Sequence, residues 1–419
     1  MNDAVEDTDA RRVAELRDAL VERLIATRQI TSAEVEAAFR AVPRHEFAPA
    51  GTPLEAIYNP GDSVVTKRDE YGVAVSSISA PFIQARMIEQ AELGPGMSAL
   101  EVGSGGYNAA LMAEVVGPNG RVVSVDIDPE VSDRARTLLE TTGYGDRVTV
   151  VSGDAGHGVP EFGIFDRIIV TVGAPDIPGS WLKQLARDGV IVLPLIMNGV
   201  TRSIAFRRQG DHLASTSAEV CGFVPMQGDG AQPEKVLLLP DAQGCHVRLR
   251  FNDGGPENPS LLDGVLATER TTVWSGVTIP HGVSFADLHL WFAGFLPGFC
   301  KLAADEGTVL AEERKTWFPF GVARGDSFAY LAVRPALEGA GVEFGARAYG
   351  PHGQDAATAM VEQIEAWDRR ARRGQVPTFA FWPTGSDSDS DQIRARLPEG
   401  VAVFTAAHGL ITISWPPAG

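Results

Sequence analysis

The sequence predicts an α/β fold with a parallel, doubly wound sheet, and residues 97–126 are the first reason. They read MSALEVGSGGYNAALMAEVVGPNGRVVSVD: an apolar run, a glycine turn, a helix-forming segment and a second apolar run that ends at Asp126. This order has the length of one βαβ unit. Further strand-like runs at 148–151, 168–172 and 190–193 are separated by helix-like segments. Strands that alternate with helices at this spacing favour a parallel sheet.

The part of the chain before this unit is expected to be mainly helical. Apolar residues recur at helical spacing and predict a helix over about 9–28, and Thr31 with Glu34 fits a capping box for the next helix. Residues 53–78 are rich in turn formers, so we expect either a hairpin or a loop over the site. Pro81 is well placed to begin a helix that ends before the Gly-Pro-Gly at 94–96.

The sequence changes character near residue 235. Before it, segments 203–207 and 215–224 predict an antiparallel hairpin at the edge of the sheet. After it, strand-like and helix-like segments follow one another in an α+β pattern, without a second glycine turn. We therefore expect two domains: residues 1–235, divided into helices with a substrate loop (1–95) and a Rossmann-like core (96–235), and a C-terminal α+β domain at 236–419.

The composition is that of an ordinary soluble globular protein, with 44% hydrophobic and 21% charged residues among 419. A formal net charge of −18 argues against a nucleic-acid partner, because phosphate binding needs a basic face. The three cysteines, at 221, 245 and 300, are widely spaced and odd in number, which favours a reducing compartment and suggests neither a disulfide framework nor a zinc site. The N-terminus lacks an apolar signal region and no run approaches a membrane span. We expect a cytoplasmic protein without membrane contact.

The glycine turn and three acids predict a nucleoside cofactor. Bare backbone at the turn lets a ligand approach closely, but Asn108 stands where a dinucleotide fingerprint would place a third glycine. S-adenosylmethionine is therefore favoured. Asp126 can hold a ribose diol, Asp154 can accept a hydrogen bond from an adenine amino group, and Glu101 precedes the turn. One such acid could be a solvated strand end, whereas three at the ends of consecutive strands indicate a ligand site.

A second signal is the run Ser76-Ser77-Ile78-Ser79-Ala80-Pro81, directly before a helix start. A serine in this position is commonly a helix cap. The functional alternative is that Ser79, with Ser77 and Ser76, holds a substrate carboxylate near the methyl donor, where helix N–H groups also point outward. Lys67 could add positive charge, although an exposed turn is the simpler interpretation of its surroundings.

Seven motifs occur in an order that resembles one family. They are VPRHEFAP, ISAP, LEVGSGGYNAAL, VVSVD, VSGDAGHG, FDRIIVTVGAP and LKQLARDGVIVLPL. Over roughly residues 10–230 the chain resembles protein-L-isoaspartate O-methyltransferases. The resemblance implies a Rossmann-like, S-adenosylmethionine-dependent carboxyl methyltransferase in which Ser79 contacts the carboxylate to be methylated. The residues expected to bind the cofactor are Glu101, Gly103, Ser104, Gly105, Gly106, Tyr107, Asp126, Ile127, Asp154 and Ala155.

The chain departs from the repair enzymes of that family in several places. Its glycine loop, GSGGY, is one residue shorter, Phe82 follows ISAP in place of histidine, and VVTKRDEYGVAVSS replaces a short linker before ISAP. These features, with the extension at 236–419, are similar to the FxLD-type branch associated with lanthipeptide pathways. That resemblance implies methylation of an aspartate side chain in a cyclised, ribosomally made precursor peptide, with an aspartimide or isoaspartate as the later product. The extension would then hold the peptide.

Two other functions stay open on the sequence. One is a general repair enzyme for isoaspartate in damaged proteins. The other is a non-catalytic protein that keeps the fold and binds peptides, since the shortened glycine loop departs from active relatives. An enzyme of this kind needs no strong general base, because a carboxylate is already ionised near neutral pH.

Overall fold

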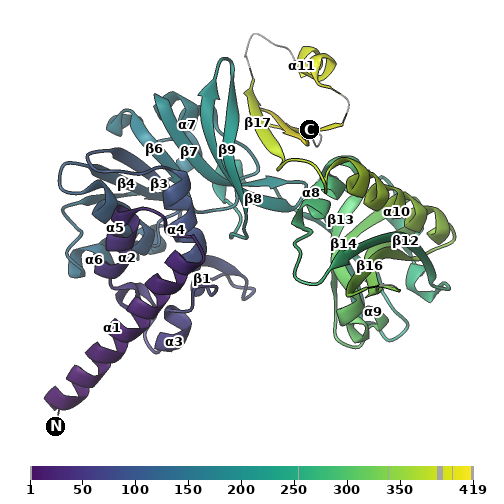
Figure 1. The fold of residues 1–419 in the computed structure, drawn as a ribbon, viewed down its shortest axis with the longest axis horizontal. Helices are drawn as coiled ribbons and strands as arrows, with labels where there is room; N and C mark the ends of the chain where they lie inside the picture. The colour runs from purple at the N-terminus through teal and green to yellow at the C-terminus, as the bar shows by residue number, and fades with distance from the viewer. Residues whose placement is uncertain (1, 253, 338, 385–389, 399, 417–419) are drawn as a thin grey trace.

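Figure 1 shows the computed structural model, which describes residues 2–252, 254–337, 339–384, 390–398 and 400–416. Two large sheets dominate the molecule. The first is built mainly from the N-terminal half of the chain, and the second from residues between 235 and 349. The last strands of the chain, in yellow, lie beside the first sheet (Figure 1).

The first sheet has ten strands in the order β18-β19-β17-β9-β8-β7-β6-β3-β4-β5. Its parallel part confirms the predicted α/β fold, and its order reverses at β3, so that β4 and β6 lie on opposite sides of it. Ligands bind where such a reversal opens a crevice at the carboxyl ends of the strands. The parallel strands are β3 (Ser98–Val102), β4 (Arg121–Asp126), β5 (Val148–Ser152), β6 (Phe165–Val170) and β7 (Leu185–Met197). The connecting helices are α5 (Tyr107–Val116), α6 (Pro129–Thr141) and α7 (Gly179–Gln184).

An antiparallel part completes this sheet. The predicted hairpin is present as β8 (Val200–Gln209) and β9 (His212–Val220). Its expected place at the sheet edge is wrong, because β17 (Thr378–Pro383) pairs with β9, followed by β19 (Gly409–Ser414) and β18 (Val401–Ala406). The end of the chain thus returns to the first sheet instead of staying in the expected α+β domain. Pairing between such distant segments leaves no local pattern in the sequence.

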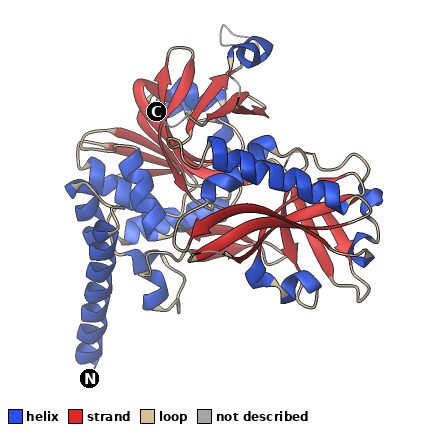
Figure 2. Ribbon diagram, turned by 45° about the vertical axis from the view of Figure 1, so that its right-hand side comes forward, coloured by secondary structure: helices blue, strands red, loops and turns tan. Residues whose placement is uncertain are grey.

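The second sheet has seven antiparallel strands in the order β10-β11-β13-β14-β15-β16-β12. Figure 2 shows α10 lying across one face of it, where Met360 and Ile364 share a buried cluster with Phe344. The strands are β10 (Lys235–Pro240), β11 (His246–Phe251), β12 (Thr271–Pro280), β13 (Phe299–Ala304), β14 (Trp317–Arg324), β15 (Ser327–Pro335) and β16 (Gly341–Tyr349). The helices of this half are α8 (Ala286–Phe295), α9 (Val309–Glu312), α10 (Gly353–Arg370) and, after β17, α11 (Ser390–Arg396).

The two sheets share one hydrophobic core. Helix α8 contributes Leu288 and Phe292 to the same buried cluster as Leu193 of β7. Within β3, successive residues point to opposite faces, so Leu100 belongs to this cluster and Ala99 to a second one under the N-terminal helices. Both faces of the parallel sheet are therefore covered, as is usual for such sheets.

The N-terminal part contains α1 (Asn2–Ala26), α2 (Ala33–Ala41), α3 (Leu54–Ile57) and α4 (Pro81–Gln90), with a hairpin of β1 (Val64–Arg68) and β2 (Ala74–Ile78). Pro81 begins α4 as predicted. The predicted capping box is wrong: Ser32 caps α2, whereas the Thr31 hydroxyl donates to Glu89 of α4 at 2.8 Å. Thr31 bonds a residue of another helix, α4, instead of taking part in a capping box with Glu34. Among the described residues, no helix has both the length and the apolar character that crossing a membrane requires.

Candidate active site

The glycine turn, residues 103–106, leads from β3 into α5. Gly103 and Gly106 have φ angles of +96° and +84°, a backbone conformation that residues with a side chain rarely adopt. A Cβ atom on Gly103 would lie 2.6 Å from Oγ1 of Thr171, and one on Gly106 would lie 3.2 Å from the Phe47 ring. Both positions need glycine, because the chain turns sharply between two packed neighbours.

A pocket that we call the Asp126 pocket opens at the carboxyl ends of β3, β4 and β5. Five of the expected cofactor residues line it: Gly103, Asp126, Ile127, Asp154 and Ala155. The remaining lining residues are Val75, Val102, Val125, Val172, Pro225, Met226 and Gln227. The fold thus brings expected residues from three different strand ends together in one pocket.

Asp126 is held in a fixed orientation. Its Oδ2 accepts a hydrogen bond from the Ser104 main-chain N–H at 2.8 Å, and its Oδ1 accepts one from the Asp128 N–H at 2.9 Å. Burial raises the pKa of this carboxyl, and the two backbone donors oppose that rise. A carboxylate oxygen has two lone pairs, so each oxygen keeps one for a ligand. This geometry suits a vicinal diol.

Asp154 is covered by a loop that the sequence did not predict. Its Oδ1 accepts from the Gly156 N–H and its Oδ2 from the Asp229 N–H, both at 2.8 Å. Gly228 has a φ of +77°, and a Cβ there would collide with the Asp154 carboxylate. The loop therefore places Met226 and Gln227 in the pocket wall. Apart from its glycines, the segment carries no sequence signal that would have revealed this role.

Glu101, Gly105 and Tyr107 line a smaller neighbouring pocket, here called the Glu101 pocket, which shares Gly103 with the Asp126 pocket. Glu101 is fully buried. Its carboxylate accepts from Asn108 Nδ2 at 2.9 Å and from the Ser124 hydroxyl. Burial is the main cause that raises the pKa of Glu101 to about 7. Asn108, which replaces the third glycine, thus supports the acid behind the turn.

Ser104 and Gly106 hold the turn together and line neither pocket. The Ser104 main chain binds Asp126, whereas its hydroxyl is buried and makes no hydrogen bond to the described residues. Gly106 packs against Phe47. The structure places these two expected cofactor residues behind the site.

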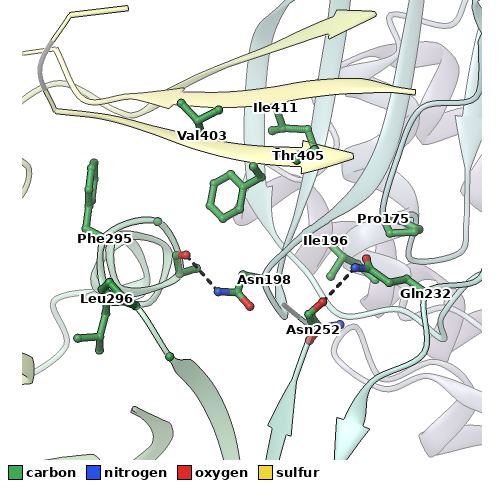
Figure 3. A pocket seen from close by; sticks show the side chains of 15 residues that line it. Pro175, Ile196, Asn198, Gln232, Asn252, Phe295, Leu296, Val403, Thr405 and Ile411 are labelled. Atoms are coloured by element: carbon green, nitrogen blue, oxygen red, sulfur yellow. Dashed lines mark hydrogen bonds between the residues drawn. The ribbon is translucent and has the colours of Figure 1, made fainter. Parts of the chain in front are cut away.

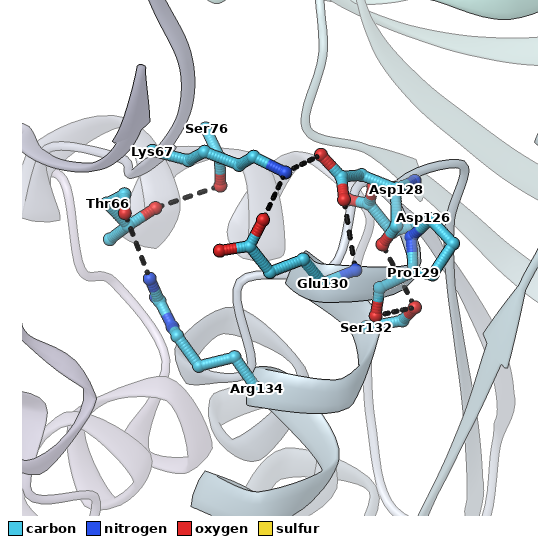
Figure 4. Close-up of polar contacts among 9 residues, drawn as sticks. All are labelled: Thr66, Lys67, Ser76, Asp126, Asp128, Pro129, Glu130, Ser132 and Arg134. Atoms are coloured by element: carbon cyan, nitrogen blue, oxygen red, sulfur yellow. Dashed lines mark hydrogen bonds and ion pairs between the residues drawn. The ribbon is translucent and has the colours of Figure 1, made fainter. Parts of the chain in front are cut away.

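The three serines fall into two groups. Ser77 and Ser79 line the Glu101 pocket and also a larger cavity of about 480 Å³, the Ser79 pocket. Ser76 lies on the other face of β2, and its hydroxyl accepts from Thr66 Oγ1 at 2.9 Å (Figure 4). The N-cap of α4 is Ala80, without a side-chain hydrogen bond, so the Ser79 hydroxyl does not cap the helix. The Ser79 pocket is further lined by Gly61, Ser63, Val65, Ala74, Ala80, Phe82, Ile83 and residues 222–225.

Lys67 is not an exposed turn residue. Its ammonium lies 2.6 Å from Oδ2 of Asp128 and 2.7 Å from Oε2 of Glu130, at the start of α6 (Figure 4). Asp128 also caps α6 by accepting from the Glu130 N–H at 3.0 Å, as its position before Pro129 predicts. Hairpin β1–β2 is therefore tied to the strand end that carries Asp126.

The side chains of the Asp126 pocket fit a nucleoside. Asp126 offers oxygen acceptors for a diol, and the apolar side chains of Ile127, Val172 and Met226 offer flat contact for a base. Asp154 lies in the same pocket and is held by two main-chain N–H groups. His157 and Asp229 lie close to Asp154, with ligand atoms all within 4.8 Å of one another. Both are exposed, and Nε2 of His157 lies 3.0 Å from Oδ2 of Asp229, which is an ordinary hydrogen-bond contact at the surface.

A further cavity of about 540 Å³ lies where α8, the β7–β8 turn and β18–β19 meet (Figure 3). Asn198 donates to the Ala293 carbonyl at 3.3 Å, and Gln232 donates to the Asn252 carbonyl at 3.0 Å. Phe295, Leu296, Val403 and Ile411 add apolar surface. No lining residue carries a charge.

The chain is similar to known proteins over its N-terminal half. Residues 15–231 match the family model described as Protein-L-isoaspartate(D-aspartate) O-methyltransferase (PCMT). The chain is 38% identical over 232 residues to the protein-L-isoaspartate O-methyltransferase of Hyperthermus butylicus, covering 51% of this chain and 90% of that protein. For the protein of the same name from Methanopyrus kandleri the identity is 39% over 224 residues, covering 51% and 92%. A solved structure of a protein-L-isoaspartate O-methyltransferase aligns over 56% of this chain and 84% of its own, with 26% identity and a TM-score of 0.48.

Proposed function

The chain belongs to the protein-L-isoaspartate(D-aspartate) O-methyltransferase family, and we propose on this premise that it methylates the free carboxylate of isoaspartyl residues in proteins or peptides. It is an S-adenosylmethionine-dependent carboxyl methyltransferase. When bound, S-adenosylmethionine supplies an electrophilic methyl group on a sulfonium. Asp126, Ile127, Asp154 and Ala155 would hold its nucleoside part in the Asp126 pocket.

The observation that carries the proposal is the position of Ser77 and Ser79 on the wall between the Ser79 pocket and the Glu101 pocket. Gly103 connects the Glu101 pocket to the Asp126 pocket. An acceptor in the Ser79 pocket and a donor in the Asp126 pocket would therefore meet beside these hydroxyls. Serine hydroxyls can donate hydrogen bonds to a carboxylate and orient it.

The pocket around Ser79 is suited to an anionic nucleophile that needs no base. Methyl transfer to an ionised carboxylate depends on alignment with the methyl group and on removal of water. The residues that line the Ser79 pocket include no acid that would repel the acceptor, and Phe82 and Phe223 supply apolar surface that excludes water. The chemistry expected of the site is thus positioning rather than proton transfer.

A second candidate acceptor is the aspartate side chain of a cyclised, ribosomally made precursor peptide. The match to the family model ends at residue 231, so the second sheet and strands β17–β19 lie outside it. The cavity of about 540 Å³ between α8, the β7–β8 turn and β18–β19 supports this candidate. Its amide side chains and apolar wall, without charge, suit a neutral polypeptide segment.

One experiment separates the candidates. The protein is incubated with S-adenosylmethionine and either an isoaspartyl peptide or a cyclised aspartyl precursor peptide, and methylation is followed by mass spectrometry. Methylation of the isoaspartyl peptide supports the first proposal, and methylation of the precursor alone supports the second. Binding of S-adenosylmethionine without methylation of either peptide would contradict both proposals. It would support the alternative of a non-catalytic, peptide-binding protein. In the same assay Ser79→Ala should methylate more slowly than wild type. Ser76→Ala serves as its control, because Ser76 is close in sequence but its hydroxyl bonds Thr66.

A further inference from the structure

Arg44 is a buried cation behind the active site. Its side chain is fully buried, and its guanidinium donates three hydrogen bonds to uncharged oxygens. Nε donates to the Ile57 carbonyl at 2.8 Å, Nη1 to Gln84 Oε1 at 2.7 Å and Nη2 to the Ser79 carbonyl at 2.8 Å. Its central carbon lies 4.9 Å from the centre of the Tyr107 ring.

The charge of Arg44 is not paired with an opposite charge in the part of the chain that the structure describes. Among the described residues, no carboxylate forms a salt bridge with Arg44, whereas Arg40, four residues earlier, bonds Asp18, Glu22 and Glu36. Burial lowers the pKa of Arg44, but a guanidinium remains protonated in proteins. Buried charges are normally paired, because an unpaired one is costly. The structure therefore maintains a costly positive charge at this place.

The contacts of Arg44 show where that charge acts. Ser79, Gln84 and Tyr107 all line the Glu101 pocket, and Ser79 also lines the Ser79 pocket. Neither pocket contains a cationic side chain of its own. Charges interact more strongly inside a protein than in water. The Arg44 guanidinium, which is separated from the pockets only by the residues it contacts, can therefore attract a carboxylate bound in them.

We propose that Arg44 is a positioning residue for the acceptor carboxylate. It fixes the main chain at Ser79 through the Nη2 hydrogen bond, and its charge provides the positive potential that the pocket side chains lack. The inference rests on the proposed carboxyl methylation. It goes further in one respect: the positive charge of Arg44, together with the serine hydroxyls, favours a negatively charged carboxylate as the acceptor.

The test compares Arg44→Met with the wild-type protein, using an isoaspartyl peptide as substrate and the methyl ester of the same peptide as an uncharged competitive inhibitor. We expect kcat/KM for the isoaspartyl peptide to fall about 10- to 100-fold. Inhibition by the ester and the Kd for S-adenosylmethionine should stay within about 3-fold of wild type. Arg40→Met is the matched control, since its salt bridges lie away from the pockets.

Equal weakening of the charged peptide and of its ester would overturn the proposal, because a merely structural role would affect both. Where Arg44→Met does not fold, Arg44→Lys carries the test. The ammonium keeps the charge but cannot make the three-way set of hydrogen bonds, so kcat should fall while the preference for carboxylate over ester persists. Loss of that preference in Arg44→Lys would refute the role of the charge. A wild-type protein that does not methylate the isoaspartyl peptide would instead refute the proposed function.

Discussion

The ammonium of Lys67 lies 2.6 Å from a carboxylate oxygen of Asp128, and this ion pair ties hairpin β1–β2 to the first turn of α6. The same hairpin contributes Val75 to the Asp126 pocket and Ser77 to the Ser79 pocket. The main-chain N–H of Asp128 in turn orients Asp126. One ion pair therefore links the wall of the acceptor site to the cofactor side of the molecule.

Lys67→Met should loosen the hairpin and weaken binding of the methyl donor. We expect the Kd for S-adenosylmethionine to rise about 2- to 5-fold, mainly through faster dissociation, because a single ion pair that is still partly in contact with solvent makes a small contribution. Stopped-flow fluorescence would measure the dissociation rate. Arg68→Met is the control, since Arg68 bonds the Gly72 carbonyl within the hairpin itself. Equal effects of the two variants would show that the ion pair with Asp128 has no special role.

Ser79→Ala should reduce turnover and leave donor binding nearly unchanged. A hydrogen bond to a charged group is worth about 1.5–3 kcal/mol, which corresponds to a loss in kcat/KM of about 10- to 100-fold. Steady-state kinetics with the isoaspartyl peptide, together with calorimetric titration of S-adenosylmethionine, would measure both quantities. Ser76→Ala should behave like wild type in the same assays. A loss of donor affinity as large as the loss of turnover would mean that Ser79 supports the fold instead.

Glu101 should make folding stability depend on pH. Its pKa is raised from an ordinary value near 4.5 to about 7, so between these values the folded protein binds a proton that the unfolded chain has released. The favourable contribution of the protonated form is complete below pH 4.5 and is lost as the pH rises through about 7. The loss amounts to at most about 3 kcal/mol.

Glu101→Gln removes this titration. The free energy of unfolding is measured in urea for wild type and Glu101→Gln at pH 5 and pH 7.5. As the pH rises between these values, wild type should lose stability relative to Glu101→Gln. The exposed Glu140→Gln variant is the control and should show no such change. If the unfolding free energies of wild type and Glu101→Gln depended on pH in the same way, the raised pKa of Glu101 would be contradicted.

Phe381 tests whether β17 is a structural part of the first sheet. The residue is fully buried in the same cluster as Leu193 and Phe206. Phe381→Ala should lower the free energy of unfolding by about 3–5 kcal/mol, as removal of a buried phenylalanine does. It should also lower the melting temperature of the methyltransferase region itself. Val376→Ala, at a position 77% exposed, should have almost no effect.

Local signals account for what the sequence could predict. The glycine turn, Asp126 and Pro81 are recognisable because the strand end, the turn and the helix start lie within a few residues of one another. The opposite orientations of Ser76 and Ser77 could also be predicted from the sequence once a hairpin is assumed. Residues of a strand alternate between its faces, so a hairpin at 64–78 places Ser77 opposite Ser76.

The remaining features join segments that are distant in the sequence. The loop around Gly228 closes on Asp154, Lys67 reaches Asp128, and β17 pairs with β9. The uncompensated charge of Arg44 is of the same kind, since it is recognised only when all its surroundings are known. Such pairings depend on how the chain folds back on itself, and a single sequence carries no pattern for them.

The return of the C-terminal strands has a consequence for biosynthesis. Leu213 of β9 pairs with Arg208 of β8 on one side and with Phe381 of β17 on the other, so this side of β9 stays open until β17 has been synthesised. Contacts between such distant residues form slowly, and an unpaired strand edge can meet other chains in the meantime. The extension thus makes completion of the methyltransferase sheet depend on strands that are synthesised long after β9.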